Sequence, residues 1–302
     1  AGAKLTGGEP TLHPQFVPIV DMLTAAGLSI TMETNGTLVD ADLARYLAQH
    51  TALTFVAVSI DGPTAEIHDP FRGVAGSFDA ALRGVRHLVA AGYRPQVIAS
   101  IHRGNLARVE EIVQLALELG AGSVKFNPVM RVGRGTAMYE RGEALDPLEI
   151  IDLAHFVRGP LQQQMPIRLI LSTPLAFYTA GELLRLGNDS QCQIRHILGI
   201  LGSGDMALCG IGQTIPQLCF GNLREVGVAE VWVNHPFLRQ LREDLSGDYP
   251  GICGQCIHAP RCLAYCVAQN YFDRGELVSP PTMCVEAQRQ GRFPASRLRQ
   301  GK

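Results

Sequence analysis

The eight cysteines of this chain all lie between Cys192 and Cys284. Seven of them follow a regular series: Cys192, then Gly204 and Cys209, then Cys253-x2-Cys256-x5-Cys262-x3-Cys266, and finally Cys284. Thiolates separated by such short steps can converge on one soft centre, so zinc and iron–sulfur ligation both satisfy the spacing. A disulfide-stapled domain is disfavoured, because the first residues do not resemble a secretory signal and a long cysteine-free segment precedes the series.

Three polar turns that contain glycine each follow an apolar run. They are Thr6–Pro10, Glu33–Gly36 and Ser59–Pro63. Each is also ordinary turn chemistry when taken alone. In a parallel α/β domain, however, ligands bind at the carboxyl ends of strands, so three such turns on consecutive strands would share one rim and one ligand. Gly7 and Gly8 let the backbone approach that ligand, and Glu9 can accept hydrogen bonds from an ammonium group.

The elements that must position these turns alternate between strands and helices. The predicted strands are Ala3–Thr6, Leu28–Glu33, Thr54–Ile60, Gln96–Ile101, Ser123–Val129 and Pro166–Ser172. The predicted helices are Gln15–Ala26, Ala41–Gln49, Phe78–Ala91, Leu106–Leu119 and a segment from Asp146 to about Val157. Asp40, Ser77 and Asn105 are predicted to cap the helices that follow them. This order predicts a parallel sheet with helices outside, either an open doubly wound sheet or a barrel.

In order and content the three turns, with His68-Asp69 and Arg72-Gly73, resemble the radical SAM superfamily. Its members cleave S-adenosylmethionine (SAM) reductively with a [4Fe-4S] cluster. The resemblance covers residues 1 to about 175 and implies an α/β fold, a partial (β/α)6 TIM-like barrel. It also implies a SAM site in which Glu9 holds the amino group and Ser59 the carboxylate. The residues implied to bind SAM are Gly7, Gly8, Glu9, Asn35, Ser59 and Arg72.

The family's Cys-x3-Cys-x2-Cys motif, which binds the SAM cluster, lies upstream of its Gly-Gly-Glu turn. Only six residues precede Gly7, and none is cysteine. We therefore interpret the chain as truncated before that motif, with the first β/α unit missing. This fragment alone is expected to be inactive, because the SAM-cluster ligands lie outside it.

The cysteine series resembles the SPASM domain, a seven-cysteine extension of many peptide-modifying radical SAM enzymes, and all seven positions match. The resemblance implies two auxiliary [4Fe-4S] clusters on a smaller, cysteine-rich α+β domain. The first would be bound by Cys192, Cys209 and Cys266, and the second by Cys253, Cys256, Cys262 and Cys284. Cys219 lies outside the pattern and is either a fourth ligand of the first cluster or, as we favour, a packed core residue.

We place the barrel domain at residues 1–175 and the SPASM domain at 185–302, because a turn-rich segment near 187–190 precedes the first cysteine. The 26 basic and 28 acidic residues leave a net charge of −2, so no global field favours nucleic acid or an anionic membrane as a partner. No run of about 18 apolar residues exists, so a membrane span is not expected. Because such clusters are oxygen-sensitive, a reducing cytoplasm is expected.

Together these resemblances imply a maturase that cleaves SAM reductively and uses a 5′-deoxyadenosyl radical to abstract hydrogen from a peptide or protein. They imply an electron donor such as flavodoxin or ferredoxin, and they assign no catalytic residue. Anaerobic sulfatase maturation is disfavoured, because Gly210 follows Cys209 where those enzymes carry an aspartate. Two alternatives remain: a zinc-stabilised α/β binding protein, and a degenerate, non-catalytic peptide carrier that keeps only the scaffold.

Overall fold

The computed structural model describes residues 1–186, 192–210 and 215–299. The chain divides into two compact units. The first unit comprises Ala1–Val129 and Phe156–Leu171, and the second comprises Met130–His155 and Ser172–Lys302. The chain therefore visits the second unit once before it completes the first.

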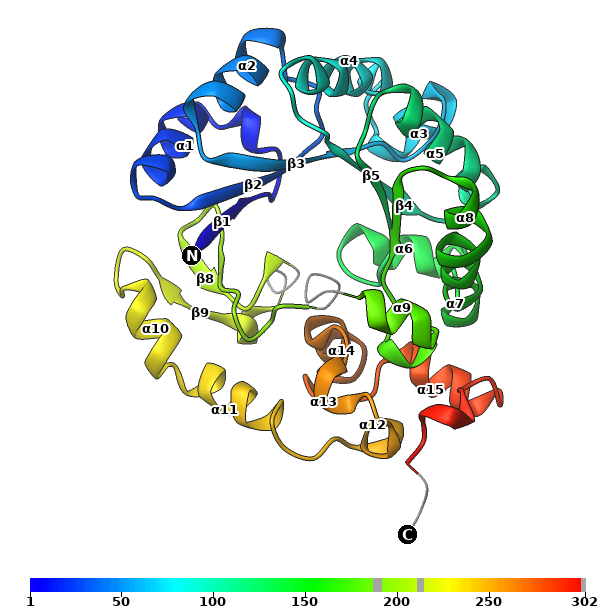
Figure 1. The fold of residues 1–302 in the computed structure, drawn as a ribbon. Coiled ribbons are helices and arrows are strands. Elements are labelled where there is room, and N and C mark those ends of the chain that lie inside the picture. Colours follow the sequence, from blue (N-terminus) through cyan, green and yellow to red (C-terminus); the bar gives the residue numbers. More distant parts are fainter. Residues whose placement is uncertain (187–191, 211–214, 300–302) are drawn as a thin grey trace. The chain divides into compact units, whose positions relative to one another are not determined.

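The first unit is built on a six-stranded, wholly parallel sheet whose strands follow the order of the chain (Figure 1). The strands are β1 Gly2–Leu5, β2 Ser29–Thr34, β3 Leu53–Ser59, β4 Gln96–Ile101, β5 Ser123–Pro128 and β6 Arg168–Leu171. All six predicted strands are present. The sheet is that of a partial TIM-like barrel, because strands in sequential parallel order with helical crossovers curve in one direction.

Helices α1, α2, α4 and α5 lie along one side of this sheet (Figure 1). The helical elements of the first unit are η1 Pro10–Leu12, α1 Phe16–Ala25, α2 Ala41–His50, α3 Ala65–Arg72, α4 Ser77–Ala90, η2 Leu106–Arg108, α5 Val109–Glu118, η3 Val157–Leu161 and α8 Gln162–Gln164. The Asp40 cap is confirmed, since its Oδ1 accepts a hydrogen bond of 2.8 Å from the Leu43 amide.

Two of the predicted caps are wrong. Ser77 is the first residue of α4, and its hydroxyl donates to Asp69 at 2.9 Å, while Gly76 takes the cap position with a φ of 77°. Asn105 makes no capping bond either. Its side-chain amide instead donates to the carbonyls of Asp61 and Ser100 at 2.7 and 2.8 Å. The Asn105 oxygen that a cap would use accepts a 2.9 Å bond from the His102 amide, and the Ser77 hydroxyl is bonded to Asp69.

Helix α4 lies very close to the turn that follows β2, and a glycine stands on each side of the contact: Gly84 in α4 and Gly36 in the turn. A Cβ on Gly84 would stand 2.0 Å from the carbonyl oxygen of Gly36, which is backbone and cannot move aside. Gly36 itself has a φ of 76°, and a Cβ there would meet Val58 Cγ1 at 2.7 Å. The close contact between α4 and this turn therefore requires glycine on both sides.

Gly84→Ala is accordingly expected to lower the free energy of unfolding by about 1–3 kcal/mol, because α4 must shift away from the turn. Urea denaturation followed by circular dichroism measures the change. Gly181→Ala in helix α9 (Ala180–Arg185) is the matched control, since the nearest atom to the new Cβ is 3.8 Å away and alanine favours a helix by about 0.5–1 kcal/mol. Equal stability of Gly84→Ala and the parent would contradict the packing described here.

The second unit holds a three-stranded antiparallel sheet, β7 Gly199–Ile200, β8 Asp205–Ala207 and β9 Cys219–Asn222, surrounded by short helices. Those helical elements are α6 Arg134–Glu140, α7 Pro147–Phe156, η4 Leu175–Phe177, α9 Ala180–Arg185, η7 Pro216–Leu218, α10 Val228–Asn234, α11 Pro236–Asp244, α12 Gly251–Gln255, α13 Ala259–Cys262, α14 Val267–Arg274, α15 Thr282–Arg289 and η8 Ala295–Arg297. The α+β character is as expected, but this unit is not smaller than the first, because Met130–His155 belongs to it.

Two apolar cores stabilise the second unit. One joins the β8–β9 hairpin to α10, α11 and α14 through buried side chains such as Met206 and Leu218. The other places Ile151 of α7 against Cys256 and Cys284, which explains why segment 130–155 belongs to this unit. Within the described residues, no helix combines the length and the apolar character needed to cross a membrane.

Candidate functional site

Glu9 links the turn after β1 to the end of β2. Its Oε1 accepts hydrogen bonds from the hydroxyls of Thr34 at 2.6 Å and Thr11 at 2.7 Å, and from the Thr11 amide at 3.1 Å. Its Oε2 accepts one bond, from the Asn35 amide at 2.6 Å. A carboxylate offers about four acceptor sites, so Oε2 retains capacity for a further donor such as an ammonium group. Glu9 is thus both a structural tie and a candidate ligand-binding group.

The other predicted residues of this rim lie on the same two turns or on the next strand. Gly7 has a φ of 114°. A Cβ on Gly7 or on Gly8 would meet no atom within 4 Å, so the backbone here is accessible to a ligand. The Asn35 side-chain oxygen accepts two 2.8 Å bonds from Thr37 and closes the turn. Ser59 is half-buried at the end of β3. We call Gly7, Gly8, Glu9, Asn35 and Ser59 the rim site.

Arg72 is engaged elsewhere. Its Nε lies 2.5 Å from Oδ2 of Asp61, whose side chain is fully buried. Asp61 Oδ1 accepts a 2.7 Å bond from the Ser100 amide, and the Asp61 amide donates to Nδ1 of His68 at 3.1 Å. Burial lowers the pKa of His68, which fits the neutral ring that this bond requires. The predicted SAM residue Arg72 therefore compensates a buried carboxylate in this structure.

Two charged residues that the sequence reasoning missed, Lys4 and Lys125, act on each other and on Glu33, which begins the second polar turn. Lys4 Nζ is 2.6 Å from Glu33 Oε1, and both charges act on Lys125 of β5. Burial lowers the pKa of Lys125, Glu33 opposes that shift and Lys4 adds to it. The sequence signal for Lys125 was its position between the apolar Val124 and Phe126 within a strand. Alternate residues of a strand face opposite sides of a sheet, so Lys125 faces the side opposite to its neighbours.

In the second unit the cysteines separate into two sets by their electrostatic coupling. The first thiol set is Cys192, Cys209 and Cys266. Cys192 is exposed as a residue, but the protein around its sulfur raises its pKa to about 12, with Cys266 and Cys209 adding to the effect. Burial also raises the pKa of Cys266, the Gln269 amide opposes this, and Cys209 again adds to it. The ionised forms of these three thiols would therefore repel one another.

The second thiol set is Cys253, Cys256, Cys262 and Cys284. Burial raises the pKa of Cys253 to about 12, and Cys262 and Cys256 add to the shift. The pKa of Cys284 is raised well above its usual value by burial first, and then by the other three thiols. Thiols that oppose one another's ionisation need a cationic centre to be thiolates together, which is what a cluster or metal supplies. Cys253, Cys256, Cys262 and Cys284 also line one pocket, and thiol sulfur is the donor type of both zinc and iron–sulfur sites.

Cys219 is not among the charged neighbours that raise the pKa of Cys192 or Cys266. It begins β9, pairs with Ala207 of β8 and is half-buried between the buried Leu218 and Phe220. Within the part of the chain that the structure describes, no three His, Cys, Asp or Glu side chains are arranged to hold a metal ion.

The segment between Cys262 and Cys266 has an unusual backbone. Leu263, Ala264 and Tyr265 have φ angles of 52°, 57° and 65°, and these are the only non-glycine residues with positive φ in the described chain. This left-handed conformation costs about 1–2 kcal/mol per residue, because Cβ approaches the following carbonyl oxygen. The surrounding structure must therefore hold this turn in place.

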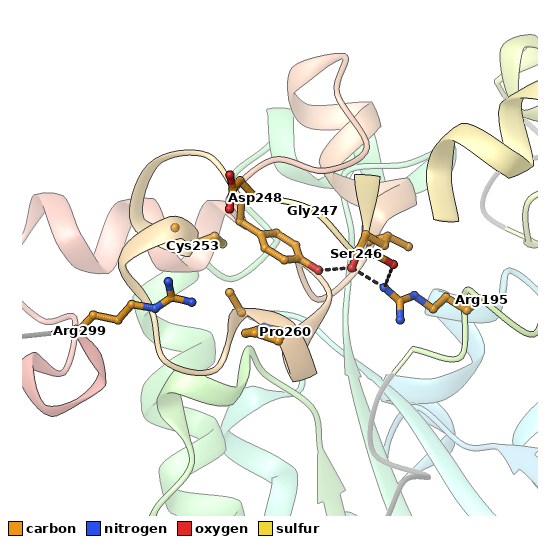
Figure 2. Close-up of a pocket in the computed structure, with 11 residues that line it drawn as sticks. Arg195, Ser246, Gly247, Asp248, Cys253, Pro260 and Arg299 are labelled. Atoms are coloured by element: carbon orange, nitrogen blue, oxygen red, sulfur yellow. Dashed lines mark hydrogen bonds between the residues drawn. The ribbon is translucent and has the colours of Figure 1, made fainter. Parts of the chain in front are cut away.

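Cys253 also borders a cavity of about 430 Å³, shown in Figure 2. Arg195 and Arg299 line it from opposite sides, and Arg195 Nη2 donates to Ser246 Oγ at 3.0 Å. Burial raises the pKa of Cys256. The amides near that thiol oppose the rise, and Arg297 and Arg299 oppose it to a smaller extent. One side of the second thiol set therefore opens on a cavity lined by guanidinium groups.

Residues 2–116 match the model of the radical SAM superfamily, and residues 192–257 match that of SPASM, an iron-sulfur cluster-binding domain. The mycofactocin maturase MftC of Mycobacterium ulcerans (strain Agy99) is 30% identical over 287 residues, which cover 94% of this chain and 74% of that protein. This chain belongs to the radical SAM superfamily. The cofactors of this superfamily and of its SPASM domain are SAM and [4Fe-4S] clusters, which favours iron–sulfur ligation over zinc.

Two further similarities bear on this radical SAM chain. The AdoMet-dependent heme synthase of Methanosarcina barkeri (strain Fusaro / DSM 804) is 30% identical over 297 residues, covering 93% of this chain and 81% of that protein. The crystal structure of Streptococcus suis SuiB bound to precursor peptide SuiA has a TM-score of 0.70 at 17% identity. It covers 93% of this chain, which spans less than two thirds (64%) of the SuiB chain, and it supports the fold.

Proposed function

We propose that this chain is the SAM-binding and auxiliary-cluster-binding part of a maturase that modifies a peptide or protein. When bound, SAM and its cluster would supply reductive cleavage and hydrogen abstraction. The observation that carries the proposal is that Cys253, Cys256, Cys262 and Cys284 line one pocket, and that the segment 192–257, which holds four of the seven thiols, matches SPASM. The maturase name of the Mycobacterium ulcerans relative supports a peptide substrate.

In this proposal the first thiol set binds one auxiliary cluster and the second thiol set binds the other. Residues 1–175 form the radical SAM core and 185–302 the SPASM domain. The amides that donate to Cys266 and Cys256 lower the negative charge that each bound thiolate presents. The proposal includes a reducing cytoplasm, because the clusters are oxygen-sensitive. It also includes an electron-donor protein of the flavodoxin or ferredoxin kind, because the cleavage of SAM is reductive.

The rim site would bind SAM through the roles its geometry allows. Glu9 offers the free acceptor capacity of Oε2 to the amino group, and Gly7 and Gly8 let the backbone close on the ligand. The half-buried Ser59 hydroxyl is available for the carboxylate. For Arg72 we propose an indirect role: its ion pair with Asp61 positions the turn that follows Ser59.

Glu9→Gln is expected to weaken SAM binding by roughly 1.5–3 kcal/mol, or about 10- to 150-fold, because the amide cannot supply the charge that an ammonium group needs. Calorimetry on reconstituted protein measures the affinity. Glu118→Gln makes the same charge change at an exposed position of α5 and is expected to leave the affinity unchanged. If the two variants bind SAM equally well, Glu9 does not hold the amino group.

A heme precursor is the second candidate substrate, because the Methanosarcina barkeri heme synthase matches this chain at the same identity as the maturase. Anaerobic incubation of the reconstituted enzyme with SAM and reductant, with either a precursor peptide or an iron porphyrin precursor, separates the two. A mass change confined to the peptide supports the maturase. A mass change confined to the porphyrin overturns it in favour of heme synthesis.

A further inference from the structure

Cys262 and Cys266 are four residues apart but belong to different thiol sets. In a right-handed helix, residues at this spacing lie on the same face, so both thiols would point to one centre. Here Cys262 lines one small pocket together with Cys253, Cys256 and Cys284, and Cys266 is not among the residues that line it. Helix α13 ends at Cys262, α14 begins after Cys266, and between them lie the three residues with positive φ.

We propose that this left-handed turn, Leu263–Tyr265, directs Cys262 and Cys266 to two different clusters, and that Asn270 is the positioning residue that holds it. The inference rests on the proposed ligation of both thiol sets. A left-handed turn reverses the direction in which successive residues rotate about the chain, so the thiol after it leaves the face that the thiol before it occupies. None of its three residues is glycine, so the sequence itself does not favour the conformation.

Asn270, on α14, is only 3% exposed and supplies the donors that stabilise the turn. Its Nδ2 donates to the carbonyl of Ala264 at 2.8 Å and to that of Ser279 at 2.9 Å, with Leu277 at 3.4 Å. An amide nitrogen has two hydrogens, so the two short bonds use both of them. Asn270 therefore ties the centre of the turn to the segment that leads into α15, which carries Cys284.

The turn is also fixed at its edges. The Tyr265 hydroxyl donates to the carbonyl of Ser172 at 2.9 Å, and the Tyr265 amide donates to the carbonyl of Cys262 at 2.9 Å. Ala264 is buried, with 1% of its surface exposed. The backbone amide of Asn270 donates to the carbonyl of Cys266 at 3.0 Å. Asn270 is therefore bonded both to the turn and to the residue that follows it.

Asn270→Leu tests the proposal, because leucine keeps the branched shape and removes both donors. After anaerobic reconstitution of the whole chain, we expect its iron content to fall to about half of the parent value or less, with the electron paramagnetic resonance spectrum altered. Asn234→Leu, the same substitution at the exposed end of α10, is expected to keep the parent iron content and spectrum. Parent iron and an unchanged spectrum in Asn270→Leu would overturn the proposal.

Ala264→Gly in the Asn270→Leu background separates positioning from general support of the fold. Glycine adopts positive φ without the Cβ penalty, so the double variant is expected to recover much of the lost iron and the parent spectrum. No recovery, whether or not Asn270→Leu folds by itself, would mean that Asn270 does not act through this turn. Failure of the parent protein to bind iron would instead overturn the proposed ligation, which keeps the two outcomes distinct.

Discussion

Cys253→Ala is expected to lower the iron of the reconstituted protein by about one to four of about eight atoms per chain, and to lower its absorption near about 400 nm. Cys253 is buried within the second thiol set, where its charge couples to Cys262 and Cys256. Alanine removes one of four thiolates and leaves an iron without a protein thiolate, so the expected loss runs from that single iron to the whole second cluster. The first cluster should keep its own electron paramagnetic resonance signal, because none of its three thiols is changed.

Two further cysteine variants serve as controls. Cys192→Ala is expected to remove the signal that Cys253→Ala retains, since it belongs to the first thiol set. Cys219→Ala is expected to preserve both signals and to cost about 1 kcal/mol of stability, as for a small truncation in a core. Loss of one signal in Cys219→Ala would instead identify Cys219 as the fourth ligand of the first cluster.

Arg72→Met is expected to destabilise the protein by about 3–5 kcal/mol, because it leaves the carboxylate of Asp61 buried without its cation. The Asp61 side chain is fully buried and 2.5 Å from Arg72 Nε, while Arg72 itself is 28% exposed. Methionine retains most of the apolar stem, so the loss reports chiefly on the charge. Chemical denaturation of the parent and the variant measures the difference.

A double-mutant cycle distinguishes this structural role from direct SAM binding. Asp61→Asn removes the buried charge and keeps an oxygen for the Ser100 amide, so it is expected to recover part of the stability lost in Arg72→Met. Arg86→Met, at an exposed position of α4, is expected to change stability by no more than about 0.5 kcal/mol. Parent stability combined with weakened SAM binding in Arg72→Met would assign Arg72 to the ligand.

Most of the first unit could be predicted locally. Its strands are apolar runs bounded by turn residues, and the segment Gln96–Ile101 has the predicted limits. Asp40 caps α2 as predicted, because its partner, the Leu43 amide, is only three residues away. The predicted Asn105 cap was wrong, because the Asn105 oxygen accepts from the His102 amide. Its side-chain nitrogen donates to Asp61, which is 44 residues distant, so only the folded sheet brings them together.

Part of the rim site could be predicted from the sequence in the same way. Glu9 follows a Gly-Gly pair, and its type and place indicated a ligand, but its bonds to Thr34 and the Asn35 amide depend on β1 lying beside β2. Lys125 was missed, because its proximity to Glu33 requires strands that are far apart in the sequence. Charge pairs of this kind are set by the curvature of the sheet.

The order of the cysteines alone identified which residue types could bind a cluster and, through the family they resemble, which would act together. Their spacing did not distinguish zinc from iron–sulfur, since thiolates suit both. Nor could it place Cys262 and Cys266 with different neighbours. That separation depends on three positive φ angles, which the residues of the turn do not favour and which Asn270 stabilises from the next helix. Local propensity determines elements, whereas a strained turn exists only where bonds from the folded chain offset its cost.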